Sequence, residues 1–453
     1  MRITQYILSI TGALFFSFFT VTAQTTVTLE ECHRDALAYN KSLDLARMDM
    51  DYAETAIKAA RTSYFPKVDG SASALFLPDF EGISFAGFTL PTTEEAQAGN
   101  FSGTSGVDVP GFDLGMSDLQ LYMAGVGVEQ PLFAGGRIRL ANQKAQRGAD
   151  IAREALNLTR AEVLHGTDRV FWSLVAVQEQ LKVLEGHVEA LDSLEDLLRV
   201  QYELGIVPRS EMLKVSVQRN EAQLRLVEVN NMLNLTGMNL ARLTGRDLDE
   251  PLRAVAAPEP EAALESVMPI ALDEDFSRRP ELQMLMQQHE IARLERLSIQ
   301  GEYLPQLGVS MQYQYLRVPD LMSGSWNLTL GAGVSMPIVH WRERKHRTDM
   351  ARIDEMKYET KLYDTRDQMA VEVRQNRMNM QSGARRIEVA HINVEQAAET
   401  MSEVELSFEA GLNTVTDLLN ARVAYQRAAA SLAEARANLE ILKSAYLKSL
   451  GLL

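Results

Sequence analysis

Residues 305–316 read PQLGVSMQYQYL, and apolar and polar side chains alternate along this stretch. Residues 326–336, WNLTLGAGVSM, alternate in the same way. A period of two places successive side chains on opposite faces of a β-strand, so each stretch predicts a strand with one apolar and one polar face. The polar faces consist of small or uncharged residues, which the water-filled lumen of a barrel accommodates.

The first half of the chain holds two weaker counterparts, at about 66–77 and 118–130. In the second of these the apolar phase slips near Gly125, which predicts a glycine bulge. Each predicted strand is roughly 10–12 residues long, close to the 9–11 residues with which a tilted strand crosses a bilayer. Aromatic residues stand near the strand ends, as in the interfacial girdles of membrane barrels. A half-buried sheet of a soluble protein is the alternative.

Four strands are too few to close a membrane barrel, because known barrels start at about eight strands. The backbone N–H and C=O groups at an open sheet edge have no water to hydrogen-bond within lipid. A membrane barrel would therefore require further copies of this chain. A short loop joins the strands of the second half, about 305–316 and 325–337. Residues 78–117 instead form a long loop rich in Gly, Ser, Thr, Pro and Phe, which is typical of the extracellular side.

A very long helix is predicted after each strand pair. No proline interrupts Ile138 to Leu204, and at 1.5 Å per residue this helix would be about 100 Å long. Residues 342–410 are similar. Apolar residues recur at spacings of three and four before and after each turn, which predicts antiparallel hairpins packed along heptad seams. Glu195 and Arg219 interrupt the first seam.

Each hairpin has a sharp predicted turn. Gly205 and Gly411 stand where the end of a helix requires a positive φ. Ser210 and Thr414 are the predicted N-caps of the returning helices, and Pro208 suits a helix start.

The two halves of the chain repeat one plan. Residues 64–68, YFPKV, recur as 303–307, YLPQL, and residues 202–206, YELGI, recur as 408–412, FEAGL. We therefore divide the chain into a signal peptide, two repeats and a linker between them. Their bounds are 1–23 for the signal peptide, 24–245 for the first repeat, 246–275 for the proline-containing acidic linker, and 276–453 for the second repeat.

The N-terminus indicates export. Arg2 precedes an apolar run over 7–21, and Val21-Thr22-Ala23 forms a small-residue cleavage site. The run is shorter than the roughly 20 residues of a spanning helix. The formal net charge of −16 argues against a nucleic-acid partner. Cys32, the lone cysteine, is predicted to be a small apolar residue of the first helix.

Together these features resemble the TolC-type outer-membrane efflux protein family, also called outer membrane factors. Three stretches carry the resemblance: residues 130–137, QPLFAGGR, after the second strand; residues 28–31, TLEE, at the first helix; and the duplicated hairpin tips. It implies a mostly α fold with a small β part, in which a homotrimer forms a twelve-stranded outer-membrane barrel, four strands per chain. A long coiled-coil tunnel would continue it through the periplasm.

The resemblance also implies a function and a gate. The channel would pass small molecules from a periplasmic adaptor protein and an inner-membrane pump, and it would contact outer-membrane lipid. Asp417 falls on an acidic ring position that implies cation selectivity, and Asn420 occupies the second ring position. Asn413 replaces a linking arginine. Phe408 replaces a linking tyrosine whose acidic partner corresponds to Glu211. We therefore expect other contacts to hold the closed state. Alternatively, Asp417 is a solvated charge on a helix face.

Five tip residues match the adaptor-docking region of the family: Gly205, Ile206, Val207, Gly411 and Leu412. Residues 340–347 read as a solvated basic patch just below a strand, near lipid head groups. Its two histidines are six residues apart and do not share a helix face, which argues against a metal site.

The sequence predicts neither an enzyme nor a cofactor. It contains no phosphate-binding loop, no H-E-x-x-H and no G-x-S-x-G, so the energy for export would come from a partner. Two further hypotheses stay open: a free-standing passive porin and a periplasmic coiled-coil scaffold.

Overall fold

The computed structural model describes residues 25–78, 83–91, 106–114, 118–256, 276–319 and 322–453. The predicted signal peptide and most of the predicted linker lie outside these residues. The chain divides into two compact units. The first contains residues up to 51, 151–286 and 360–453, and the second contains 52–150 and 287–359, so each unit combines segments from both sequence repeats.

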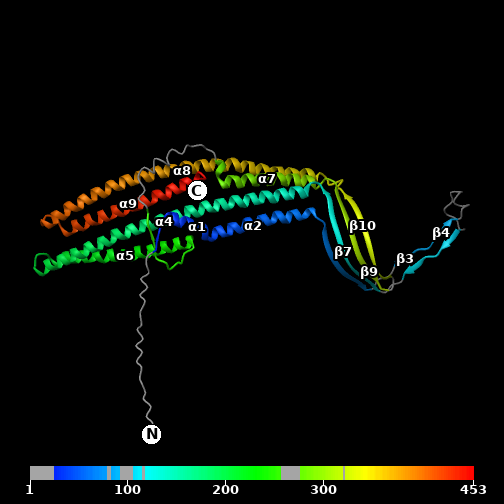
Figure 1. Ribbon diagram of the computed structural model, residues 1–453, viewed down its shortest axis with the longest axis horizontal. Helices are drawn as coiled ribbons and strands as arrows, with labels where there is room; N and C mark the ends of the chain where they lie inside the picture. Colours follow the sequence, from blue (N-terminus) through cyan, green and yellow to red (C-terminus); the bar gives the residue numbers. More distant parts are fainter. Residues whose placement is uncertain (1–24, 79–82, 92–105, 115–117, 257–275, 320–321) are drawn as a thin grey trace, which may run out of the picture. The chain divides into compact units, whose positions relative to one another are not determined.

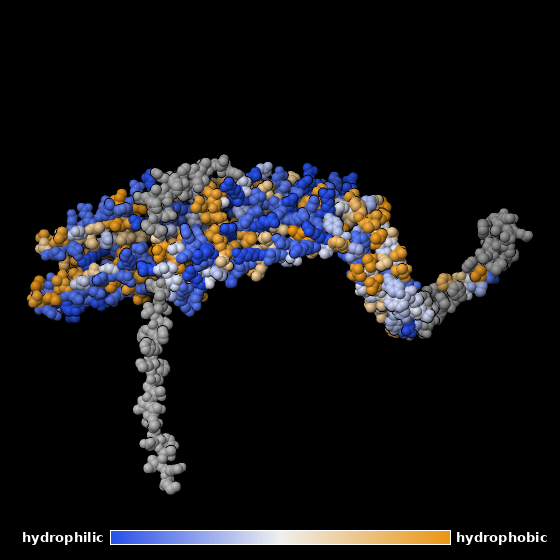
Figure 2. Space-filling view, in the orientation of Figure 1, coloured by the Kyte–Doolittle hydropathy of each residue, from blue (hydrophilic) through white to orange (hydrophobic). Residues whose placement is uncertain are grey.

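The second unit is built around one antiparallel sheet (Figure 1). Its strands are β2 (Lys67–Pro78), β7 (Asp118–Ala134), β9 (Gln306–Val318) and β10 (Met322–Ser335), in the order β10-β9-β7-β2. The register aligns Leu330, Met311, Val128 and Val68 across all four strands. Residues directly opposite share a face, so the apolar positions of the strands form one continuous surface. Figure 2 shows hydrophobic residues gathered over these strands.

The bulge predicted near Gly125 is wrong. Pairing of β2 with β7 runs without interruption from Lys67–Glu129 to Pro78–Asp118. The register shift lies instead against β9, between Pro131 and Phe133, where proline has no N–H to donate. Glycine is required at 125 because a Cβ there would lie 2.8 Å from the Tyr313 carbonyl oxygen.

Two short ribbons lie within the predicted loop 78–117. β3 (Ile83–Phe85) pairs with β6 (Phe112–Leu114), and β4 (Phe88–Pro91) pairs with β5 (Gly106–Val109), both antiparallel. The Gly- and Ser-rich composition of this segment concealed these pairings.

The two long helices are confirmed. α4 (Arg137–Glu203) and α8 (Glu343–Glu409) each contain 67 residues, and they turn back into α5 (Arg209–Thr244) and α9 (Val415–Ser449). Figure 1 shows α4 beside α5 and α8 beside α9. The other described helical segments are α1 (Leu29–Tyr39), α2 (Lys41–Arg61), η1 (Thr62–Tyr64), η2 (Phe276–Arg278) and α7 (Pro280–Gly301). None of the described helices has the length and apolar character needed to cross a membrane.

A small core in the first unit joins α1 to the long helices. β1 (Thr25–Val27) pairs in parallel with β8 (Leu252–Ala254), and Val27 packs with Phe171 and Leu240 in a buried cluster. Cys32 belongs to the same cluster, as the sequence predicts for a small apolar residue. Burial raises the pKa of the Cys32 thiol to about 11, so the thiol stays protonated at neutral pH.

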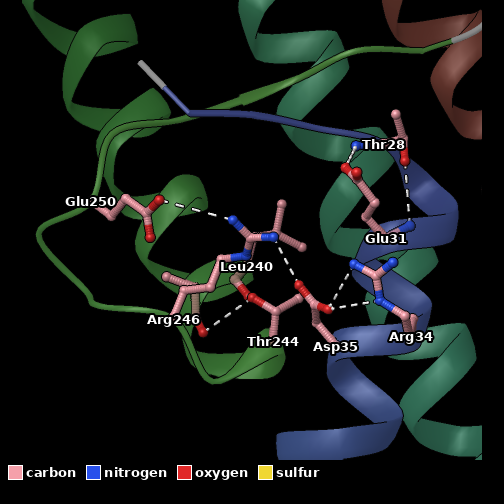
Figure 3. Close-up of polar contacts among 9 residues, drawn as sticks. Thr28, Glu31, Arg34, Asp35, Leu240, Thr244, Arg246 and Glu250 are labelled. Carbon is pink, nitrogen blue, oxygen red and sulfur yellow. Dashed lines mark hydrogen bonds and ion pairs between the residues drawn. The ribbon is translucent and has the colours of Figure 1, made fainter. Parts of the chain in front are cut away.

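Figure 3 shows how polar contacts fasten α1 to the end of α5. Thr28 and Glu31 cap the start of α1 by exchanging side-chain-to-backbone hydrogen bonds. Arg246 donates to Asp35 at 2.7 Å and lies 3.9 Å from Glu250. α5 ends at Thr244, and the following Gly245 has a φ of 71°, which permits the sharp exit of the chain.

A buried polar network joins α1, α4 and α9 in the first unit. The Asp168 carboxylate accepts hydrogen bonds from His33 Nε2 and from the Ser444 hydroxyl. Because Ser444 donates its only hydroxyl proton to Asp168, its Oγ can only accept from His165. His165 Nδ1–H therefore donates to Ser444 Oγ at 2.9 Å. A nucleophilic serine would need a histidine that accepts its proton, so this cluster is a structural brace.

Acidification is expected to destabilise the chain through His165. Burial is the main cause that lowers the pKa of His165 below 6.5. Lys448 and Arg169 lower it further, whereas Asp168 opposes them. The unfolded chain therefore binds a proton before the folded chain does, so stability that is complete above about pH 6.5 is lost as the pH falls below it.

Denaturant unfolding between pH 5 and 7.5 tests this expectation. His165→Gln should reduce the pH dependence of the unfolding free energy, whereas His391→Gln, at an exposed position of α8, should leave it unchanged. Equal pH slopes for the wild type and His165→Gln would contradict the assignment.

Candidate functional site at the helical hairpin tips

The two hairpin turns have the same backbone geometry. Gly205 and Gly411 have φ values of 73° and 74°. In the first turn Gly205 N–H donates to the Tyr202 carbonyl and Ile206 N–H to that of Gln201. The second turn repeats both bonds from Gly411 and Leu412. This pairing defines a Schellman motif, so the predicted requirement for a positive φ is confirmed at both tips.

The returning helices begin differently. Thr414 is the N-cap of α9, as predicted, and exchanges a capping box with Asp417. The prediction for Ser210 is wrong: α5 begins at Arg209, so Pro208 occupies the N-cap position and no side chain caps the helix. Proline fixes φ and lacks an N–H, which starts this helix without a polar cap.

Asp417 is bound within its own chain. Its carboxylate accepts hydrogen bonds from the Thr414 backbone N–H at 3.0 Å and from the Thr414 hydroxyl at 2.6 Å. The side-chain hydrogen bond, followed by the backbone hydrogen bond, lowers the pKa of Asp417. In a single chain, therefore, this exposed carboxylate stays ionised well below neutral pH.

An apolar cluster joins the two hairpins directly behind the tips. Leu191 and Leu198 of α4 pack with Val215 of α5 and with Leu418 and Leu419 of α9. The predicted site residues Phe408 and Val207 pack against this cluster. Phe408 therefore contributes an apolar contact where the family resemblance implies a polar one.

Polar contacts also link the hairpins. Arg422 of α9 donates to the Ala190 carbonyl of α4 at 2.8 Å and to Glu405 of α8 at 2.6 Å. Lys214 of α5 donates to Glu211 at 2.8 Å and to Thr416 of α9 at 3.3 Å. The sequence reasoning did not identify Arg422 or Lys214, because Ala190, Glu405 and Thr416, which they bind, lie on other helices.

Only one of the two carboxylate oxygens of Glu211 has a hydrogen-bond partner among the residues that the structure describes. Its Oε1 bonds to Lys214, but its Oε2 is buried without a hydrogen-bond partner in the described part of the chain. The seam interruptions Glu195 and Arg219 pair with each other through an Arg219 Nη1 to Glu195 Oε2 bond of 2.6 Å, although Arg219 Nε is buried without a hydrogen bond within the described residues. A pair of opposite charges at facing seam positions was the signal that could have identified this bond from sequence.

The remaining predicted site residues lie on the surface of the tips. Ile206 and Leu412 are 66% and 80% exposed, and Figure 2 shows hydrophobic residues at these ends of the helices. Asn413 donates its backbone N–H to the Ser407 carbonyl. Asn420 lines a groove of about 490 Å³ between α5 and α9, together with Lys214, Arg225, Thr416 and Arg427.

The sequence of this chain is similar to those of known outer-membrane proteins. Residues 33–246 and 271–451 match the outer membrane efflux protein family. The chain is 25% identical over 343 residues to the alkaline protease secretion protein AprF of Pseudomonas aeruginosa, covering 70% of this chain and 67% of that protein.

The fold is similar to those of solved outer-membrane channels. The Campylobacter jejuni CmeC channel matches with a TM-score of 0.72 and 16% identity, covering 93% of this chain and 85% of the other. The Vibrio cholerae outer membrane protein VceC matches with a TM-score of 0.70 and 14% identity, covering 93% and 96%. The open Neisseria gonorrhoeae MtrE channel matches with a TM-score of 0.68 and 14% identity, covering 93% and 88%.

Proposed function

Because this chain belongs to the outer membrane efflux protein family, we propose that it is the outer-membrane exit duct of a tripartite efflux or export system. Three copies form a homotrimer whose barrel lies in the outer membrane and whose helices lie in the periplasm. A periplasmic adaptor protein and an inner-membrane pump deliver the exported molecules, and the pump supplies the energy. The role of the chain is conduction rather than catalysis.

The observation that carries this proposal is the open-edged sheet. β2 and β10 form the two edges of a four-stranded sheet whose apolar face is exposed in the single chain, with Leu330 72% and Val68 65% exposed. In lipid, the unpaired backbone groups of both edges require partners. Pairing β10 of one copy with β2 of the next satisfies them, and three copies close the cylinder.

Disulfide cross-linking tests this closure. In a Cys32→Ala background, Ser73→Cys in β2 is combined with single cysteines scanned along residues 327–331 of β10. The expected result is a covalent trimer for the pairs in register, because a disulfide forms only when the two Cα atoms lie about 4.4–6.8 Å apart. A chain that yields only monomers and stays in buffer without detergent would overturn the proposal.

Asp417 forms the narrow, cation-selective end of the duct in this proposal. Its hydrogen bonds from Thr414 support this role, since they favour the ionised carboxylate that a selective ring needs. Asp417→Ala should lower the preference for cations in single-channel recordings. Thr414→Val is the matched control, because it removes the cap but keeps the charge. Unchanged selectivity in Asp417→Ala would identify Asp417 as a helix cap only.

Glu211 and Phe408 offer a test of how the duct closes. We expect Phe408→Tyr to supply a hydroxyl to the unpartnered Glu211 Oε2 and to strengthen the closed state by about 1 kcal/mol, or about fivefold in the open population. Planar-bilayer conductance should fall accordingly. Adding Glu211→Leu should erase the difference, and an unchanged conductance in Phe408→Tyr alone would show that the hydroxyl finds no partner.

The tips also form the adaptor-docking surface in this proposal. Exposed apolar residues on a rigid turn, such as Ile206 and Leu412, suit a protein contact. Beside them, the groove between α5 and α9 is lined by Arg225 and Arg427, by Lys214, which bonds to Glu211, and by Glu221, so basic groups outnumber acidic ones. A partner helix with apolar and acidic side chains would complement both features.

A further inference from the structure

The connections between strands and helices in the second unit carry an unusual charge. Residues 61–67, 134–139, 301–306 and 338–347 contain eight Lys or Arg residues and two Asp or Glu residues, in a chain whose net charge is −16. The two acidic residues already have partners, because Arg347 binds Glu302 and lies 3.8 Å from Glu343, which also bonds to His340. A positive surface therefore remains at the base of the sheet.

Six of these eight basic side chains form no ion pair within the described residues, although Lys67 lies opposite Glu129 in the register of β2 with β7. We call them the junction belt; they are Arg61, Lys67, Arg139, Arg342, Arg344 and Lys345. All six are exposed, and none makes an ion pair or a side-chain hydrogen bond within the described residues. Clustered exposed cations create a positive potential that attracts anions from outside the chain.

The turn that enters α8 holds part of this belt in an unusual backbone conformation. Trp341 and Arg342 have φ values of 40° and 68°, and no other described residue except glycine has a positive φ. The equivalent turn of the first repeat, which enters α4, uses Gly135 and Gly136 at φ 62° and 79°. Glycine adopts this conformation without strain, so the second repeat keeps a strained Trp-Arg pair where Gly-Gly would fold more easily.

The Trp341 side chain is also exposed to solvent rather than packed in a core. It is 91% exposed, and its neighbours Ile338 and Val339 are 84% and 68% exposed. An indole between apolar side chains and cations matches the chemistry of a membrane interface, where acyl chains meet head groups.

From this combination we propose that the junction belt binds anionic phospholipid head groups of the leaflet that faces the periplasm, with Trp341 inserted at the interface beside them. The inference rests on the proposed function, which places the base of the sheet at that surface. Phosphate oxygens supply the negative charge that the belt lacks.

A neighbouring copy of the chain fits this surface less well. If β10 pairs with β2 of the next copy, Arg342 and Arg344 meet the partner connection that contains Arg61 and Lys67. Like charges would then face each other, so packing of two copies increases the need for an external anion rather than removing it.

Lipid discs that contain the full trimer test the charge requirement. Retention of phosphatidylglycerol over phosphatidylcholine is measured by lipid analysis after partial delipidation, for the wild type and for Arg342→Gln/Arg344→Gln/Lys345→Gln. The preference should fall roughly fivefold for each basic residue removed, and it should weaken in high salt. The matched control, Arg366→Gln/Arg385→Gln/Arg386→Gln, removes the same charge from exposed positions further along α8 and should retain the preference.

Fluorescence of Trp341 identifies the occupant. In a Trp172→Phe/Trp326→Phe background, Trp341 is the lone indole. Lipids brominated near the head group should quench it strongly, and lipids brominated near the acyl ends weakly. Absence of quenching, or equal loss of lipid preference in the belt and control variants, would overturn the proposal. Trimers that still cross-link between β2 and β10 would show that the proposed function survives that result.

Discussion

Gly135→Ala is expected to prevent the second unit from folding. Gly135 has a φ of 62°, and a Cβ at this position would overlap the carbonyl oxygen of Gly301. The close approach is mutual, because a Cβ on Gly301 would meet the Gly135 carbonyl. Neither backbone can yield without moving the start of α4 or the end of α7. We therefore expect a loss of about 3–5 kcal/mol, from left-handed strain together with overpacking.

Gly136→Ala is the matched control, since the adjacent residue has a φ of 79° but open space around its Cβ position. It should cost only the strain of about 1–2 kcal/mol. The measurements are the yield of trimer from outer membranes and the denaturant midpoint of any trimer recovered. Similar losses for the two variants would show that backbone conformation, rather than the contact with Gly301, requires glycine here.

Arg422→Met is expected to open the resting channel. Methionine has about the length of the arginine methylene chain but lacks the guanidinium group. The substitution therefore removes the bonds to the Ala190 carbonyl and to Glu405. Hydrogen bonds from a charged group are each worth about 1.5–3 kcal/mol, and every 1.4 kcal/mol shifts an equilibrium about tenfold. If these bonds hold the two hairpins of the closed state together, the conductance of the unliganded channel should rise about tenfold or more.

Arg436→Met is the control for this change. Arg436 lies on the same helix, is exposed, and makes no ion pair within the described residues. Planar-bilayer recording and uptake of a large antibiotic by cells report the open population. A conductance that is equal in both variants would mean that the apolar cluster around Leu418, rather than Arg422, holds the hairpins together.

Signals that are local in the sequence predicted most of the fold. The alternation over 305–316 and the spacing of three and four along α4 and α8 each reflect one element's own geometry. Glycines at the tips were readable for the same reason, because a Schellman motif forms within six consecutive residues. The N-cap at Ser210 failed because proline two residues earlier also starts a helix, and local sequence does not rank the two.

Local sequence patterns did not predict the contacts between segments that are distant in the sequence. Gly125 looked like a bulge because the apolar phase changes there, but the closeness of Tyr313 on another strand is what requires glycine. The bonds from Lys214 to Thr416 and from Arg422 to the Ala190 carbonyl likewise depend on how two hairpins dock. The junction belt also needed the structure, because its residues come from three separate connections.

The sequence by itself determined that this chain has two repeats, strands that suit lipid and helices too long for a single core, since periodicity and turn chemistry act over neighbouring residues. Only the tertiary structure decided the strand register, the contacts that join the hairpin tips, and the strained display of Trp341. The register of β7 with β9 and the tip contacts join segments far apart in the sequence, and the free energy of such contacts has no signature in any one stretch of sequence. The positive φ of Trp341 is local, but nothing in the chemistry of a Trp-Arg pair predicts it.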